Sequence, residues 1–490
     1  MFKSIDKWLP GYLRSVIRRP GRVDGTRHLL FCIADHFEPF RLRAGSDGVM
    51  RKVSPAEARE FVEAWVNGYP SAVRDFRDSD GCAPHHTFFY PQEEYDPQCL
   101  DLLTKVCRDG YGEVEIHLHH RNDTAEGFRE KLVSFRDLLR REHGLLGTWK
   151  GRDVERGTLN VGRRMWGGGC GEQVVGRTKD ITLSSALLAS DLIHSTSYVP
   201  PPTPHDSNIA YGFVHGNWAL CNSRPDGDWC GVNEELGILS STGCFADFTF
   251  PSAPSPTQPR MVNAIYRAVD TPGRPRGCDS GERAEVGRKA EGGPPEADLP
   301  PAENLSSRGG SAFGGKPETG GDASSSVGYV SDSGTQVSGL RPQPSPSSLL
   351  LITGPLGLNW RRRKWGLFPR IENGEISAGS RPSVDRVAAW VRQGIHIVGR
   401  PEWVFVKLHT HSCVDANRAV LFGEHMANVR NYMHSRYNDG KAWCLHYVSA
   451  REMFNIARAA EEGMTGNPGG YRDYEVAPPP VLQKLVERRL

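Results

Sequence analysis

The chain has 490 residues, of which 38% are hydrophobic, and a formal net charge of +2. This near balance excludes a chain-wide electrostatic attraction to nucleic acid, so we expect no nucleic-acid partner. No apolar run approaches the ~20 residues that span a bilayer. Eleven cysteines without a CxxC pair favour reduced thiols over a disulfide framework, and we therefore expect a cytoplasmic protein.

The first 22 residues predict an amphipathic helix with a basic face. Such a helix either packs on the domain that follows it or lies on an anionic membrane surface. We favour packing, with Pro10 breaking or kinking the helix. The alternative is weak contact with a membrane surface through this helix, which would make the protein membrane-peripheral.

Beyond this helix, short apolar strands alternate with amphipathic helices. We predict strands at 27–37, 85–91, 112–120, 209–220, 244–252, 349–358, 402–411 and 442–449. We predict helices at 55–76, 97–110, 124–144, 383–395, 416–436 and 450–463. Asp123 or Thr124 is the expected N-cap of the third helix. Alternation of this kind is typical of a parallel sheet covered by helices.

Two segments interrupt the alternation. Residues 148–207 have no sustained hydrophobic period, and residues 279–348 are rich in Gly, Ser, Pro and charge. The second segment cannot bury enough apolar surface to offset its ordering entropy, so we predict that it is disordered. The order of the first is left open. The remainder predicts an α/β fold, a deformed (β/α) barrel assembled from residues 1–147, 208–278 and 349–490.

Polar side chains follow the predicted strands at their C-terminal ends. They are Asp35, His36, Glu38, His117, His119, His120, His215, Asn217, Asp247, His409 and His411. In α/β barrels the C-terminal ends of the strands converge, so we expect Asp and His side chains from distant strands to share one site. Imidazole nitrogens and a carboxylate suit a divalent metal, and zinc is the first choice.

Three histidines crowd the end of the third predicted strand. Strand alternation sends His117 and His119 to one face and His120 to the other, so one of the three is expected to serve packing or hydrogen bonding. A lone histidine is more often structural than a ligand. We interpret His215 and His446 as structural for this reason.

The segment HHTFFYPQEEYDPQCLDLLTKVCRDGYGEVEIHLHH, residues 85–120, resembles the polysaccharide deacetylase family (NodB homology domain, carbohydrate esterase family 4). In that family a TFF strand leads through a helix into the metal-binding histidine motif. Asp35-His36 stands where the family has an Asp-Asp pair, and Leu408-His409 matches its late Leu-His motif. The likeness covers most of the predicted barrel and leaves both insertions outside.

The chain departs from the family pattern at three places. The family's second metal-binding histidine follows the first by four residues, where this chain has Arg121. His36 replaces the second aspartate of the first motif. The Arg-x-Pro-Tyr motif has no clean copy, and residues 247–260 lie in its region. These changes indicate a divergent branch of the family.

The resemblance implies a metal-dependent hydrolase that removes N-acetyl groups from a sugar or polysaccharide. It implies Asp35 as general base and His409, or His411 two residues on, as general acid. The implied metal ligands are His36, His117, and His119 or His120.

We expect a carbohydrate partner, and four residues are candidates for binding it: Trp218, Asp247, Arg260 and Trp360. The tryptophans would stack on sugar rings, and core or edge packing explains them equally well. Two other functions stay open. One is hydrolysis of a different C–N bond on the same scaffold, such as a cyclic amide. The other is a catalytically inactive barrel that binds glycans or acts as a scaffold.

Overall fold

The structure is a computed structural model, and it describes residues 4–44, 50–151, 208–251, 254–287 and 348–482. All of the described residues belong to one compact unit. Most of the two predicted insertions, and therefore the predictions about their order, lies outside these residues. The edges of both segments are described: strand β6 includes Thr148 and Trp149, and strand β10 is Glu282–Arg283.

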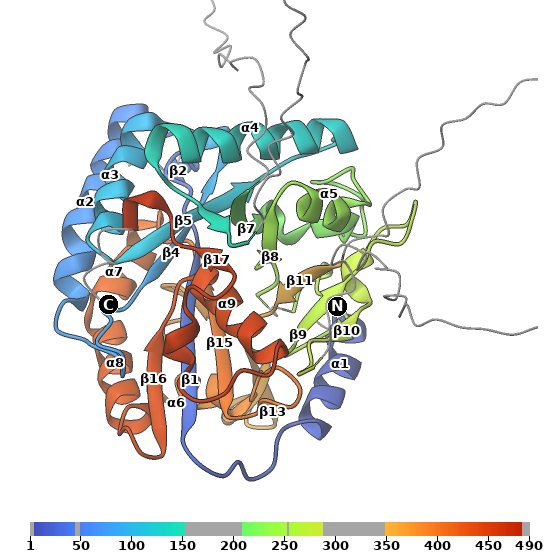
Figure 1. The fold of residues 1–490 in the computed structure, drawn as a ribbon, viewed down its shortest axis with the longest axis vertical. Coiled ribbons are helices and arrows are strands. Elements are labelled where there is room, and N and C mark those ends of the chain that lie inside the picture. Colours follow the sequence, from blue (N-terminus) through green and yellow to red (C-terminus); the bar gives the residue numbers. More distant parts are fainter. Residues whose placement is uncertain (1–3, 45–49, 152–207, 252–253, 288–347, 483–490) are drawn as a thin grey trace, which may run out of the picture. The chain divides into compact units, whose positions relative to one another are not determined.

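One large, mostly parallel sheet organises this α/β protein (Figure 1). Its strands follow the order β10-β9-β11-β8-β7-β5-β4-β1-β15-β14, and β16 also pairs with β1. Every neighbouring pair from β11 to β14 along this order is parallel. Strand β9 is antiparallel to both of its neighbours. The parallel arrangement confirms what the alternation of strands and helices predicts.

The strands and helices have the following bounds. The longer strands are β1 (Arg27–His36), β4 (His86–Pro91), β5 (Gly112–Leu118), β7 (Ile209–His215), β8 (Cys244–Asp247), β9 (Ile265–Ala268), β11 (Leu349–Ile352), β12 (Gly357–Lys364), β13 (Phe368–Glu372), β15 (Trp403–Thr410) and β16 (Trp443–Tyr447). The short strands are β2 (Arg43–Ala44), β3 (Met50–Arg51), β6 (Gly147–Trp149), β10, β14 (Glu375–Ile376) and β17 (Val476–Ala477). The helices are α1 (Ile5–Ile17), α2 (Pro55–Val73), α3 (Pro97–Arg108), α4 (Ala125–His143), α5 (Glu235–Ser241), α6 (Val384–Arg392), α7 (Asp415–Phe422), α8 (Glu424–Tyr437) and α9 (Ala450–Glu461).

Local capping fixes where the helices begin. Thr124 accepts a hydrogen bond of 3.0 Å from the backbone N–H of Gly127, which makes Thr124 the N-cap of α4. Ser54 and Glu57 form a capping box at the start of α2. The single helix predicted at 416–436 is wrong, because Gly423 has an extended backbone conformation that separates α7 from α8.

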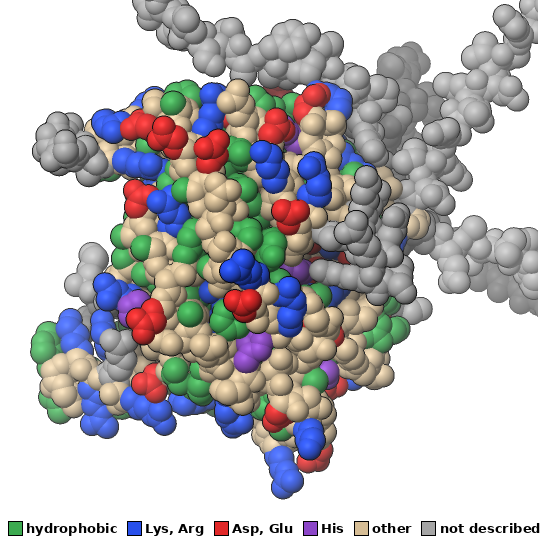
Figure 2. Space-filling model, turned by 90° about the vertical axis from the view of Figure 1, so that its left-hand side faces the viewer, with side chains coloured by type: hydrophobic (Ala, Val, Ile, Leu, Met, Phe, Trp, Pro, Cys, Tyr) green, Lys and Arg blue, Asp and Glu red, His purple; other side chains and the backbone are tan. Residues whose placement is uncertain are grey.

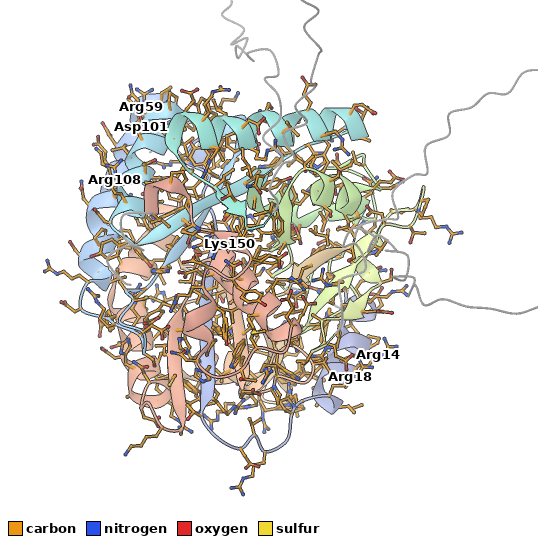
Figure 3. The ribbon with its side chains drawn as sticks, in the orientation of Figure 1. Arg14, Arg18, Arg59, Asp101, Arg108 and Lys150 are labelled. Atoms are coloured by element: carbon orange, nitrogen blue, oxygen red, sulfur yellow. The ribbon has the colours of Figure 1, made fainter. Side chains whose placement is uncertain are left out.

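The first helix packs on the body of the protein. Trp8 and Tyr12 of α1 are buried in a small cluster with Val262 and Leu356. Helix α1 continues through Pro10 without a break, and a kink there stays a prediction. Its outer surface keeps an apolar residue, Ile17, that is 83% exposed. Basic side chains lie beside it, as Figure 3 shows for Arg14 and Arg18. Contact of this surface with a membrane stays a prediction.

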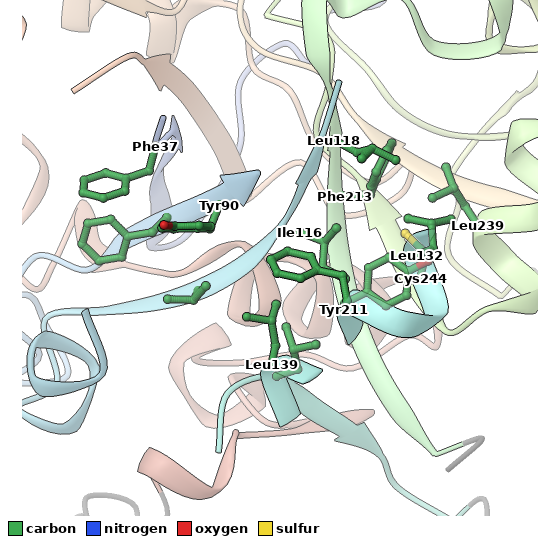
Figure 4. Packing of buried hydrophobic residues seen from close by; sticks show 14 of the residues in the cluster. Phe37, Tyr90, Ile116, Leu118, Leu132, Leu139, Tyr211, Phe213, Leu239 and Cys244 are labelled. Carbon is green, nitrogen blue, oxygen red and sulfur yellow. The ribbon is translucent and has the colours of Figure 1, made fainter. Parts of the chain in front are cut away.

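Two hydrophobic layers cover the two faces of the sheet. On one face, Leu132 and Leu139 of α4 pack in one cluster with Ile116, Tyr211 and Phe213 of β5 and β7 (Figure 4). On the other face, α9 contacts β1, β7 and β8. Near-continuous apolar strands are what a sheet buried on both faces requires.

The surface seen in Figure 2 mixes both signs of charge. Lys and Arg side chains alternate there with Asp and Glu side chains, and no single-sign field covers this face. Among the described helices, none combines the length and apolar character needed to cross a membrane.

Candidate metal centres

The edge of the sheet where the parallel strands end brings distant histidines together. Strand pairing sets His36 of β1 opposite Phe89 of β4, and Pro91 of β4 opposite His117 of β5. His36 and His117 therefore end strands on either side of β4, at the same edge. The sequence predicts this convergence, since it follows from parallel strands alone.

Three side chains at this edge form what we call the rim cluster: His36, Glu38 and His117. One nitrogen or oxygen from each lies within 4.8 Å of the others. His117 Nε2 is 3.4 Å from Glu38 Oε1, and the His36 and His117 rings are 4.9 Å apart at their centroids. Two imidazoles and one carboxylate leave coordination positions open for water, as in catalytic zinc sites.

The orientation of His117 shows that its second nitrogen is available as a ligand. His117 Nδ1 lies 2.8 Å from the carbonyl oxygen of Val214, so Nδ1 carries the proton and donates it to that carbonyl. Nε2 then holds a lone pair, is buried, and makes no hydrogen bond. A proton on Nε2, or a cation between the two groups, would offset the negative charge of the Glu38 carboxylate 3.4 Å away. The same backbone bond is the usual support of a metal-binding histidine.

Burial and neighbouring charge set the ionisation of the rim cluster. Burial and the adjacent His411 lower the pKa of His36 well below its usual value. Burial alone would raise the pKa of Glu38, but the neighbouring His117 and His411 bring it down to about 2. At neutral pH the cluster therefore offers a neutral imidazole and a carboxylate, the forms that bind a metal.

Two further histidines border the rim cluster and are partly exposed. The His119 ring lies 4.5 Å from that of His117, and its Nε2 is 3.8 Å from Glu38 Oε1. His119 Nδ1 is 2.5 Å from Glu93 Oε1. The His411 ring lies 4.6 Å from the His36 ring.

These bordering histidines have pKa values displaced in opposite directions. Burial lowers the pKa of His119, but Glu93 outweighs burial and the net displacement is upward. Burial lowers the pKa of His411 despite the opposing charge of Glu38. Two titratable groups that differ in this way can divide proton donation and proton acceptance between them.

A close contact with the backbone fixes His119. An added Cβ on Gly216 would lie 2.1 Å from His119 Cδ2, so the His119 ring rests against a surface that only glycine leaves open. Gly216 directly follows β7. The loop after β7 therefore sets the position of the imidazole beside the rim cluster.

Asp35 lies on the opposite face of β1 from His36. Its carboxylate accepts hydrogen bonds from His86 Nε2 at 2.8 Å, from the backbone N–H of Ser412 at 2.9 Å, and from the Ser412 hydroxyl. The His86 ring packs on Trp65 of α2. Asp35 is thus fully buried and hydrogen-bonded on the side of α2, and it is not a member of the rim cluster.

His409 lies near the end of β15, between a tryptophan and a buried cation. Its ring is 5.9 Å from that of Trp218, and burial and the Lys407 charge lower its pKa well below normal. Lys407 donates to the carbonyls of Phe248 and Phe250. Burial lowers the pKa of Lys407 to about 8.

Asp247 ends β8 and is fully buried. It accepts hydrogen bonds from the backbone and hydroxyl of Thr249, at 3.1 Å and 2.6 Å. Burial raises its pKa to about 7. These contacts leave Asp247 little room to bind a substrate directly.

The remaining predicted substrate-binding residues lie in different environments. Trp218 is half-buried beside His409 and has a left-handed backbone conformation, with φ 55°. Arg260 has a 73% exposed side chain, 3.8 Å from Asp279. Trp360 is 58% exposed on β12, in the hairpin that β12 forms with β13 outside the main sheet. Of these residues, only Trp218 contacts a histidine of the site.

A second group, which we call the buried cluster, lies on the other side of β5. It consists of His120, His215, Cys230 and Glu235, all buried, with one ligand atom each within 4.8 Å of the others. Glu235 Oε1 is 2.8 Å from His120 Nε2 and 3.4 Å from His215 Nε2. His120 is stacked on Phe128 of α4. His117 and His119 lie near Glu38 and His120 lies on Glu235, as predicted, but β5 ends at Leu118, so the turn after β5 and not strand alternation separates His119 from His120.

A third group of potential ligands already contains a cation. Asp78, Asp80 and His446 lie within 4.8 Å of one another. Arg472 donates to Asp78 at 2.8 Å and to Asp80 at 2.9 Å. The guanidinium neutralises both carboxylates, so this group is a salt-bridge network rather than a metal site.

Sequence reasoning missed two members of the buried cluster. Cys230 and Glu235 lie in the stretch DWCGVNEELG, which carries no recognised metal-binding spacing. The only signal is an acidic residue at the start of a short helix, and that is common. The sequence pattern favours a structural role for His215, and it places Glu38 after the first strand without indicating a role for it.

Comparison of the chain with models of known protein families, with curated proteins and with solved structures found no match.

Proposed function

We propose that the protein is a metal-dependent hydrolase that removes N-acetyl groups from a sugar or polysaccharide. The observation that carries the proposal is the unpartnered Nε2 of His117, buried and facing Glu38 with His36 beside it. A histidine oriented in this way is arranged for a cation. We further propose that the sheet curls into the deformed barrel that the resemblance implies.

His36, Glu38 and His117 would hold the metal, with zinc favoured by the two nitrogens and one carboxylate. When bound, the metal would polarise a water molecule and the carbonyl of the acetyl group. The resemblance implies only histidine ligands and makes Asp35 the general base. We propose Glu38 as the carboxylate ligand, and the carboxylate of Asp35 is engaged by His86 and Ser412.

The two bordering histidines would move the protons. His411, with a lowered pKa, is neutral at pH 7 and takes a proton from the attacking water. His119, with a raised pKa, delivers a proton to the amide nitrogen as the C–N bond breaks. Water oxygen ends on the acetyl carbon, so the products are acetate and a free amine. Solvent then returns the proton from His411 to His119.

Features of the rim fit an acetylated sugar. Trp218 offers a half-buried aromatic ring beside His409 on which a sugar ring can stack. The segments that carry the family resemblance are β4, α3 and β5, and His117 lies one residue before the end of β5. These features support a carbohydrate substrate over a generic amide.

The direct test is release of acetate from N-acetylated oligosaccharides by the purified chain, before and after removal of metal by a chelator. We expect activity that a chelator abolishes and zinc restores. His117→Ala should abolish it as well. His446→Ala is the matched control, because it removes a buried histidine from a group whose cation is Arg472.

The competing hydrolase has the same residues and a different product. Ring opening of cyclic amides without acetate release would favour that alternative. Metal binding without turnover of either substrate class would favour a glycan-binding barrel.

A further inference from the structure

We infer that the buried cluster is a second metal site, a closed structural zinc site formed by His120, His215, Cys230 and Glu235. The inference does not depend on the proposed catalytic role of the rim cluster. It rests on the orientation of the two histidines, on the contacts of the cysteine, and on the position of the four residues in the chain.

Both histidines turn the same nitrogen toward the centre of the cluster. His215 Nδ1 donates to the carbonyl of Gly216 at 2.5 Å, which leaves the lone pair on Nε2. That Nε2 is buried, makes no hydrogen bond, and lies 3.4 Å from Glu235 Oε1. His120 Nδ1 lies 3.2 Å from Asp123 Oδ2, and its Nε2 faces the same carboxylate oxygen.

The unpartnered Nε2 of His215 favours a cation at the centre of the cluster. A lone pair on His215 and a carboxylate oxygen repel each other at 3.4 Å when nothing lies between them. His215 has the usual geometry of a metal-binding histidine, with its outer Nδ1 bonded to a carbonyl and its inner Nε2 without a hydrogen-bond partner among the described residues. His120 turns its Nε2 to the same carboxylate oxygen, to which it hydrogen-bonds at 2.8 Å. The negative charge of the Glu235 carboxylate would help to neutralise a bound cation. Its second oxygen accepts a hydrogen bond from the backbone N–H of Cys221, which fixes the orientation of the carboxylate.

Cys230 supplies the fourth ligand atom. The backbone N–H groups of Asn222 and Val232 each point to its sulfur at 3.4 Å. Two such donors stabilise negative charge on sulfur, as a metal-bound thiolate requires. Tetrahedral zinc with bonds of about 2.0–2.3 Å holds its ligand atoms roughly 3.3–3.8 Å apart. In the buried cluster the His215–Glu235 distance of 3.4 Å already fits that spacing, the His120–Glu235 distance of 2.8 Å would lengthen, and all four ligand atoms lie within 4.8 Å.

The four ligands come from separate segments that the metal would join. His120 lies in the turn between β5 and α4, His215 ends β7, and Cys230 lies in the loop that leads to α5, where Glu235 begins the helix. Left-handed backbone conformations recur at non-glycine residues of this loop: Asn217, Trp218, Cys221, Asn222 and Trp229. Such residues persist only where the surroundings hold them.

The inferred site also supports the rim cluster. Gly216, which positions the His119 ring, directly follows His215, and His119 directly precedes His120. Val214, which orients His117, directly precedes His215. Loss of the buried metal would therefore disturb the histidines of the rim through their backbone neighbours. His120 and His215 act here as positioning residues.

Cobalt substitution distinguishes this site, because the inferred ligands include sulfur and those of the rim cluster do not. The full chain is purified, its zinc is measured by mass spectrometry, and Co²⁺ is exchanged for zinc. We expect two metal ions per chain and a near-ultraviolet band from charge transfer between sulfur and cobalt. Cys230→Ser should remove the band and one ion per chain.

Cys244→Ser is the matched control. Cys244 is buried and its thiol lies 3.3 Å from the carbonyl two residues on, as the Cys230 thiol does at 3.2 Å. Among the described residues Cys244 belongs to no cluster of potential ligands. This variant should keep the band and both ions. Glu38→Gln should lose one ion and keep the band.

The metal content and cobalt spectrum of the wild-type protein test the inferred zinc site even if Cys230→Ser does not fold. A wild-type protein that binds at most one ion and shows no sulfur band overturns the inference, as does an unchanged band in a folded Cys230→Ser. A band that depends on Cys230, in a protein that releases no acetate, would leave this site standing and remove only the proposed function.

Discussion

The rim cluster and the buried cluster use similar donors in different surroundings. The rim cluster has two histidines and one glutamate, and partly exposed histidines border it. The buried cluster has two histidines, a glutamate and a cysteine, and the side chains of His120, His215 and Glu235 are 0% exposed. A metal held by three protein ligands keeps open positions for water and substrate, as in catalytic sites. A metal held by four buried protein ligands has no open position and stabilises the fold, as in structural sites.

The comparison teaches that a ligand set alone does not assign a role. His119 and His120 are adjacent in the chain, yet one faces the rim beside Glu38 and the other lies against Phe128 and Glu235. Access to solvent and the number of donors separate the two clusters. Removing the glutamate of the buried cluster should therefore mainly lower stability. Removing the glutamate of the rim cluster should mainly abolish activity.

The largest effect is expected from Glu235→Ala. It leaves two buried imidazoles without their shared carboxylate, and we expect a loss of about 3–5 kcal/mol in the free energy of unfolding. Glu38→Ala should cost only about 1 kcal/mol, while abolishing activity. Urea denaturation of both variants in the presence of zinc makes the measurement. Equal losses of stability would erase the distinction between the clusters.

His117→Ala should reduce deacetylase activity by more than about 100-fold, because removal of a direct ligand exceeds the effect of removing an outer-shell partner. Metal content should fall by one ion per chain, and the sulfur-to-cobalt band should remain. Steady-state kinetics and metal analysis of the same preparation provide the test. A His117→Ala protein that keeps its full metal content would show that the rim cluster does not bind metal.

Asp35→Asn tests whether the aspartate is a catalytic base or a structural residue. Its carboxylate joins His86 to Ser412, so we expect a loss of roughly 1–3 kcal/mol in stability with metal content unchanged. The activity of the folded fraction should stay within a few-fold of the wild type. A folded variant that is inactive would restore the general-base role implied by the family resemblance.

The pH dependence of activity should reflect the two bordering histidines. The rate rises as His411 loses its proton, and because the pKa of His411 is lowered by burial this limb lies below pH 6.5. The rate falls as His119 loses its proton, and because Glu93 raises that pKa this limb lies above pH 6.5. Glu93→Gln should move only the alkaline limb, toward lower pH. Movement of both limbs would contradict this division of roles.

The smallest effect is expected from His446→Ala. The variant removes a 2.7 Å contact to Asp80, but Arg472 still neutralises that carboxylate. We expect a loss of about 1 kcal/mol in stability and no change in metal content or in the cobalt spectrum. Loss of an ion in this variant would show that the third group binds metal too.

Much of the fold follows from the pattern of residues. The strands ending at His36 and His117 are recognisable as apolar runs, and their parallel direction follows from the helices between them. The pattern also predicts that His117 and His119 lie apart from His120, although His119 and His120 follow the end of β5. The cap at Thr124 is a local signal that the structure confirms.

Other features needed the folded chain. Whether His119 or His120 faces His36 depends on the turn after β5, and the role of Asp35 depends on its contacts with His86 and Ser412. Glu235 lies 115 positions from its partner His120, and no periodicity joins residues so distant.

The sequence by itself determined that strand ends rich in histidine meet at one edge of a parallel sheet, because the periods of strands and helices are properties of consecutive residues. Only the tertiary structure decided that the polar residues divide into two centres, one at the rim and one enclosed. The physical reason is that burial, the orientation of a ring nitrogen and the approach of a distant carboxylate arise from packing between segments, and packing is not encoded in the neighbours of any single residue.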